Sequence, residues 1–177
     1  MKPLEIKKNI IKDILTPFFK NNGFIKKGVK YFKNINHFNI IVDIQSLKYH
    51  KIENREEFRV NVEINLDTCG ITIGGFSIPS NDSHITIDEK TNIEEVKLNI
   101  NKDLESLMKC FEKYDNVKEI IEEQIQEIEL LEEKIIKTKN ELNNETDNQN
   151  LIYVLKNSIE LYTNNVILIK NWIKSCN

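Results

Sequence analysis

Residues 23–66, GFIKKGVKYFKNINHFNIIVDIQSLKYHKIENREEFRVNVEINL, decide the fold. Between Phe58 and Leu66, apolar and polar side chains alternate without a break. A β-strand points successive side chains to opposite faces, so this alternation builds one apolar face and one polar face. The pattern recurs over residues 38–45. Two strands that each carry an apolar face need a covering layer, which the segments of helical periodicity on either side can supply.

The first of these helical segments spans residues 4–21. Its apolar residues recur at helical spacing, which predicts an amphipathic helix. Pro17 lies inside the pattern and is expected to kink the helix or to restart it as a last short turn. Gly23 is expected to end the helix in a left-handed conformation.

Three strands in meander order are the economical topology for the next segment. They are predicted at about 25–33, 37–46 and 58–66, with a turn at 34–36 and a charged loop over 47–57. Residues 67–83 fit either a ragged edge strand or an exposed loop, and residues 84–88 fit a further short strand. Thr91-x-x-Glu94 then predicts a capping box, and with it a helix over 92–113 that covers the sheet.

The C-terminal third predicts a helical hairpin, with helices over 117–143 and from 151 onward and a polar turn over 143–150. In the first of these helices, the residues expected to face inward are Ile121, Ile128, Leu131, Ile135 and Leu142. The last helix carries a heptad seam of Ile152, Leu155, Ile159, Tyr162, Val166, Ile169 and Ile173, and a second apolar stripe of Leu151, Val154, Leu161, Leu168 and Trp172. We expect the body of the chain to cover the second stripe and leave a monomer; the alternative is a homodimer through antiparallel final helices.

These elements predict an α+β fold: an antiparallel sheet of three to five strands packed on helices, followed by a C-terminal antiparallel helical hairpin. The expected division is an α+β domain over 1–115 and the hairpin over 116–177.

Composition excludes several classes of protein. The 177 residues carry a net charge of −3 with lysine and glutamate interspersed, so we expect no nucleic-acid partner. No apolar run is long enough to span a bilayer and no cleavage site follows the N-terminus, which favours a cytoplasmic protein without a membrane partner. The three cysteines are far apart and form no C-x-x-C motif, so free thiols are expected. No histidine or cysteine spacing fits a metal site, and no motif predicts a cofactor.

The stretches LTPFFKNNGFIKKGVKYFK, IVDIQS and FRVNV resemble a bacterial family known only as domain of unknown function family 4304. The match covers roughly residues 5–115 on the alternation pattern. It rests on Pro17, Gly23, Phe24, Lys26, Lys27, Phe32, Gln45, Phe58 and Asn61. Two positions depart from the family pattern: Glu63 stands where a glycine is expected, and His84-Ile85 stand where a tryptophan is expected. The resemblance implies neither catalytic residues nor a ligand.

The polar sheet face is where the sequence gathers candidate binding residues. They are Asp43, Gln45, Arg59, Asn61 and Glu63. If the strands over 37–46 and 58–66 pair, Asp43 lies near Asn61, with Glu63 one step along the same face. Two carboxylates on neighbouring strands are one way in which metal-dependent nucleases hold a divalent ion. The lysine that would stabilise the developing charge is missing, and a solvated face with an Asp43–Arg59 contact is the simpler interpretation.

The sequence therefore favours a non-enzymatic protein-binding module, whose partner is another protein. One version is an immunity-like or antitoxin-like protein that masks a basic partner with its acidic surface. The alternative is a metal-dependent hydrolase or nuclease-like enzyme that uses Asp43 and Glu63.

Overall fold

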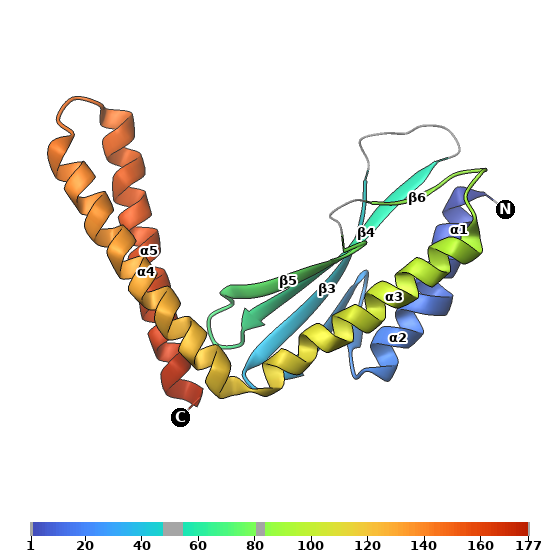
Figure 1. Ribbon diagram of the computed structural model, residues 1–177. Helices are drawn as coiled ribbons and strands as arrows, with labels where there is room; N and C mark the ends of the chain where they lie inside the picture. Colours follow the sequence, from blue (N-terminus) through green and yellow to red (C-terminus); the bar gives the residue numbers. More distant parts are fainter. Residues whose placement is uncertain (1, 48–54, 81–83, 177) are drawn as a thin grey trace. The chain divides into compact units, whose positions relative to one another are not determined.

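The computed structural model describes residues 2–47, 55–80 and 84–176. The chain forms two compact units, one of Met1–Asn65 and Thr72–Asp115, the other of Leu66–Ile71 and Asn116–Asn177. The first unit holds the sheet and the first three α-helices, and the second holds the C-terminal pair of helices (Figure 1). None of the helices in the described residues is long and apolar enough to cross a membrane.

The N-terminal helical segment has three parts: α1 (Pro3–Ile10), the π-helical turn η1 (Ile11–Leu15) and α2 (Thr16–Asn21). Pro17 lies in the first turn of α2, directly after the π-helical turn, in which the Thr16 amide donates to the Ile11 carbonyl. The prediction that Pro17 restarts the helix as a short last turn is confirmed. The π-helical turn that precedes it was not predicted.

The end of α2 is a Schellman motif centred on Gly23, whose φ is +82°. The Phe24 amide donates to the Phe19 carbonyl at 2.9 Å, and the Gly23 amide donates to the Lys20 carbonyl at 3.0 Å. The rings of Phe19 and Phe24 meet edge to face, with their centroids 5.2 Å apart. The predicted left-handed glycine is therefore confirmed, and the motif turns the chain into the sheet.

The described residues form a six-stranded antiparallel sheet. Its strands are β1 (Ile25–Lys27), β2 (Lys30–Ile35), β3 (Phe38–Ser46), β4 (Glu56–Leu66), β5 (Thr72–Ile78) and β6 (Ile85–Ile87). The order is β1-β2-β3-β4-β5, and β6 pairs with β4 beyond the end of β5. The predicted α+β class is confirmed.

One detail of the strand prediction was wrong. The strand expected over 25–33 is a hairpin, because Gly28 has a φ of +62° and turns the chain between Lys27 and Lys30. For residues 67–83, the alternative of a ragged edge strand is confirmed: β5 lies at the edge of the sheet, and its register against β4 shifts between Ile64 and Asn65. Most of the predicted loop over 47–57 lies outside the described residues.

The apolar face of the sheet is the core of the first unit. Its fully or almost fully buried side chains include Phe38, Ile40, Val42, Phe58, Val60, Val62, Ile64 and Ile78. Helices α1, α2 and α3 (Ile93–Glu112) lie against this face (Figure 1). Aromatic contacts join the two layers, with ring centroids 5.0 Å apart for Phe19–Tyr31 and 6.0 Å apart for Phe24–Phe111. The predicted covering role of the third helix is confirmed.

The start of α3 differs from the predicted capping box by one residue. Asn92 is the N-cap, and its side chain accepts a hydrogen bond from the Glu95 amide. The Thr91 hydroxyl instead bonds to Asp88 in the preceding turn, at 2.9 Å. Hydrogen bonds from the Thr91 hydroxyl and the Lys90 amide lower the pKa of Asp88.

Lys7 ties α1 to the far ends of two central strands. Its ammonium lies 2.9 Å from the Glu56 carboxylate at the start of β4 and 2.8 Å from the Ser46 hydroxyl at the end of β3. Although it is charged, Lys7 is only 7% exposed. A buried ammonium is tolerated when it is paired and hydrogen-bonded in this way.

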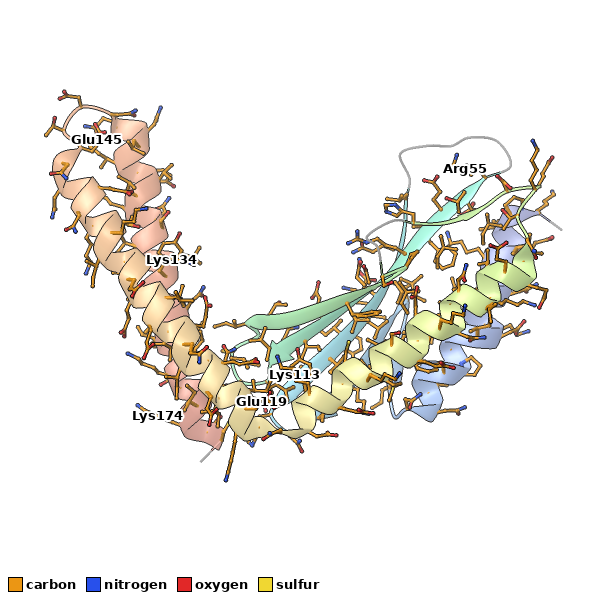
Figure 2. The ribbon with its side chains drawn as sticks, viewed as in Figure 1. Arg55, Lys113, Glu119, Lys134, Glu145 and Lys174 are labelled. Carbon is orange, nitrogen blue, oxygen red and sulfur yellow. The ribbon has the colours of Figure 1, made fainter. Side chains whose placement is uncertain are left out.

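The second unit is built on an antiparallel pair of helices, α4 (Val117–Asn144) and α5 (Gln149–Cys176). Figure 2 shows Glu145 at the turn between them, and Glu119 and Lys174 at the opposite end. Leu155, Val166 and Ile169 of the predicted α5 seam are buried. The rest of that seam is half-buried.

On α4, the buried residues are Ile120, Gln124, Ile128 and Leu131. Ile120 therefore takes the buried position expected for Ile121, which is half-buried together with Ile135 and Leu142. In the second stripe of α5 only Trp172 is buried; Leu161 and Leu168 are 57% and 37% exposed. Leu151 and Val154 of this stripe are exposed as well, and the expectation that the body of the chain covers the stripe stays a prediction.

Substituting Gly23 with alanine is expected to reduce the free energy of unfolding by about 1 kcal/mol, because an L side chain is strained at this φ. Denaturant unfolding measures the change. Asn21→Ala, at the exposed last residue of α2, is the matched control and is expected to change stability by less than about 0.5 kcal/mol. Equal stability of Gly23→Ala and wild type would show that the motif does not hold this conformation.

Candidate binding site on the open sheet face

The five candidate residues come from the two central strands, β3 and β4, which are neighbours in the sheet. At one end of this pair, the Leu47 amide donates to the Glu57 carbonyl at 3.1 Å. Continued without a bulge along an antiparallel pair, that register sets Asp43 opposite Asn61. Alternation then keeps the candidate side chains on the face that does not carry Phe58 and Val60.

Four of the five candidates line one hollow. Gln45, Arg59, Asn61 and Glu63 surround a volume of about 460 Å³. The other lining residues are Val62 of β4, Gly75, Phe76 and Ser77 of the edge strand β5, and Ser80 just after it. In the register of β4 and β5, Ser77 lies opposite Asn61 and Gly75 lies opposite Glu63. The side of the hollow formed by β5 therefore has only small residues at these two positions. The hollow is thus polar on β3 and β4 and opens toward the edge of the sheet.

Asp43 is the exception, because it does not line the hollow. Its carboxylate lies 3.6 Å from the Lys30 ammonium on β2, and the Gln45 amide donates to it at 3.3 Å. The expected contact between Asp43 and Arg59 is replaced by this ion pair with Lys30. Among the described residues, no three histidine, cysteine, aspartate or glutamate side chains are placed to hold a metal ion.

Two polar atoms in the hollow lack a hydrogen-bond partner within the described part of the chain. They are Nε of Arg59, a donor, and Oδ1 of Asn61, an acceptor. Both atoms are shielded from solvent. Asn65 is different, because its Oδ1 accepts from the Thr72 hydroxyl at 2.6 Å. Buried polar atoms are usually paired, so these two atoms, which lie beneath the surface of the hollow, are exceptions in the fold.

The two edges of the sheet differ sharply in charge. The edge strand β1 is three residues long and carries Lys26 and Lys27, whose ammonium groups lie 5.3 Å and 5.6 Å from the ring centroids of Tyr31 and Phe32. Short, lysine-bearing edges resist pairing with other strands. The opposite edge, β5, is seven residues long, with the sequence TIGGFSI and no charge. Of the two, β5 is the edge open to pairing.

Gly74 and Gly75 stand side by side in β5 for different structural reasons. A Cβ on Gly74 would collide with the Tyr114 hydroxyl on the apolar face, so a side chain is excluded there by the core. Gly75 lies opposite Glu63 and leaves the hollow open on that side. The sequence signal for this surface was the absence of charge from residue 68 to residue 81, which gave no preference between strand and loop.

A larger groove of about 820 Å³ lies between the first helical segment and α3. Its apolar lining is Ile6, Ile10, Ile14, Ile93 and Leu98, and its polar lining is Asn9, Asp13, Glu94, Lys97 and Asn101. The π-helical turn η1 contributes to this groove, and such turns often occur at functional sites. An aliphatic lining with side chains of both charges defines neither a reaction nor a ligand.

The chain matches no family model, no curated protein and no solved structure. Its resemblance to domain of unknown function family 4304 stays a prediction. Three cysteines are present as free thiols, Cys69, Cys110 and Cys176, and burial raises the pKa of the Cys176 thiol.

Replacing Asn61 with valine is expected to leave stability unchanged or to raise it by up to about 1 kcal/mol. The change removes a polar group without a partner from a strand interior and adds a residue of high strand propensity. Thermal and denaturant unfolding measure the effect.

The matched control is Asn65→Val on the same strand and face. This change removes the acceptor of the Thr72 hydroxyl and is expected to cost about 1–2 kcal/mol. If the Asn61 variant lost as much stability as the Asn65 variant, Asn61 would be a structural residue and not part of a binding site.

Proposed function

We propose that the protein is a non-enzymatic binding module that recognises an extended segment of another protein along β5 and over the adjoining hollow. The observation that carries this proposal is the position of an uncharged edge strand beside a hollow lined by Arg59, Asn61 and Glu63 of its neighbour. An extended segment can add to a free sheet edge through main-chain hydrogen bonds, while pockets beside the edge select its side chains.

The chemistry of the hollow indicates the kind of segment that fits. Arg59 and Glu63 offer one charge of each sign, and Gln45 and Asn61 add amide side chains. The β5 edge adds no charge of its own. The expected ligand is therefore an uncharged, extended segment with polar side chains on alternate positions, the arrangement that follows from strand periodicity.

When an extended segment of a partner adds to β5 as a further strand, that segment is buried. Burial of a partner's segment in this way suits an immunity-like or antitoxin-like role. The acidic surface that motivated that idea includes α4, which has eight glutamates and four lysines. In the proposed mode, the β5 edge supplies the contact and α4 supplies long-range attraction toward a basic partner.

No observation favours the metal-dependent enzyme. Asp43 is engaged by Lys30, and it does not share the hollow that Glu63 lines. The two carboxylates therefore do not form one site in which a metal ion would bind between them.

The test is selection of peptides from a random display library on the full chain, followed by mapping of the backbone amides that shift on binding. Selected peptides are expected to shift amides of β5 and of residues 59–63 on β4. Ser77→Lys should weaken binding at least about tenfold, because it places a long charged side chain in the hollow and on the edge.

The matched control changes the other edge of the sheet. Lys27→Ser on β1 should leave the affinity of the same peptides unchanged. Peptides whose binding shifts only β1 or the helices, or that bind Ser77→Lys as well as wild type, would contradict the proposal. Divalent-ion-dependent cleavage of nucleic acid that Asp43→Ala abolishes would establish the enzyme instead.

A further inference from the structure

The exposed side of α5 is an uncharged stripe with a seven-residue repeat. Val154, Leu161 and Leu168 follow one another at intervals of seven and are 56%, 57% and 37% exposed. Asn150, Asn157, Asn164 and Asn171 follow at the same interval and are all exposed. We call the apolar row and the asparagine row together the α5 stripe. A strict seven-residue repeat keeps a row on one side of a helix over several turns, which is the pattern of helix–helix contacts.

The charges of α5 lie elsewhere. Its four charged residues are Lys156, Glu160, Lys170 and Lys174. Lys170 pairs with Glu132 of α4 at 2.7 Å, and both lysines of this end line a depression with Glu129 and Glu132. That side of the hairpin is charged and hydrated, as expected for a solvated helix face. In a chain in which 30% of residues are charged, a stripe without charge from Asn150 to Asn171, about six turns of helix, is unusual.

The α5 stripe is nearly palindromic around Leu161. Seven residues before it stands Val154, and seven after it stands Leu168. Four before and four after stand Asn157 and Asn165; three before and three after stand Ser158 and Asn164. Between Val154 and Leu168, a second copy of α5, antiparallel and related by a two-fold axis at Leu161, would therefore meet apolar residues with apolar ones and amides with amides or a hydroxyl. Asn150 and Asn171 lie outside this span.

We propose that the α5 stripe binds a second copy of this chain, forming an isologous dimer through antiparallel α5 helices. Self-complementarity is what an isologous contact requires, since each residue must suit its symmetry mate. The absence of charge removes the repulsion that two identical charged faces would have. A hydrophilic partner of either sign would find no complementary charge on this surface. The contact runs from Val154 to Leu168, about 21 Å of helix at 1.5 Å per residue, and ends where the buried Trp172 begins.

This proposal concerns the second unit and is independent of strand addition at β5. A peptide-binding chain that stays monomeric would overturn it and leave the proposed function intact. A dimer that selects no peptide at β5 would do the reverse.

Light scattering of the full chain at several concentrations tests the dimer. Wild type is expected to show the mass of two chains, and Leu161→Glu is expected to show the mass of one chain with unchanged circular dichroism, because two glutamates would face each other at the symmetry axis. Ile167→Glu is the matched control, since Ile167 is equally exposed, at 50%, but does not belong to the stripe. It is expected to remain a dimer. Monomeric wild type, or dissociation by both substitutions, would overturn the proposal.

Cysteine cross-linking tests the antiparallel register, in a chain whose Cys69, Cys110 and Cys176 are replaced with serine. Leu161→Cys is expected to form an intermolecular disulfide with itself. Val154→Cys and Leu168→Cys are expected to cross-link with each other in a mixture and not with themselves. Self-linking at all three positions would show a parallel pair, and no cross-link at any of them would show that the stripe is not the interface; either result overturns the proposal.

Discussion

The burial of one face of β4 is the constraint on which the rest of the first unit depends. Four side chains of this strand, Phe58, Val60, Val62 and Ile64, are at most 3% exposed. Burial of each contributes about 1.5–3 kcal/mol, so together they supply roughly as much as the whole net stability of a typical domain. The helices α1, α2 and α3 cover this face because no other layer hides it, and Lys7 fixes α1 at its end through Glu56.

The same constraint leaves the polar face of β4 for recognition. Strand alternation places Arg59, Asn61 and Glu63 on the face of the sheet opposite to the one that α1, α2 and α3 cover. The fold completes the hydrogen bonds of Asn65 through Thr72 but not those of Asn61. An uncharged edge strand beside these polar side chains is a surface that an extended segment of another protein can use. In the second unit, α5 likewise has one buried side, while the α5 stripe on another side is apolar and exposed.

Sequence periodicity was sufficient for the elements with strong local signals. The alternation at 58–66 predicted β4, the glycine after Asn22 predicted the end of α2, and the heptads predicted the hairpin. It failed where tertiary contacts decide. Gly28 breaks a strand that looked continuous, because hairpin turns depend on a single positive φ. The prediction for β5 was ambiguous because glycines are rare in strands. Gly74 is needed there because the Tyr114 hydroxyl, from a residue far along the chain, leaves no room for a side chain. For the candidate site, the sequence predicted which residues lie on the polar face of the sheet. It did not predict that Asp43 pairs with Lys30, because that contact depends on the pairing of β2 with β3.

Hydrogen exchange of the full chain, followed amide by amide, tests most directly that β4 is the buried centre and β5 an open edge. Amides of β4 over residues 58–64 are expected to exchange only through global unfolding, since the strand has neighbours on both sides. On β5, alternate amides are expected to exchange fast because they face away from β4 and are open to solvent. Uniformly slow exchange along Thr72–Ile78 would mean that another part of the protein already covers this edge, and would contradict the account.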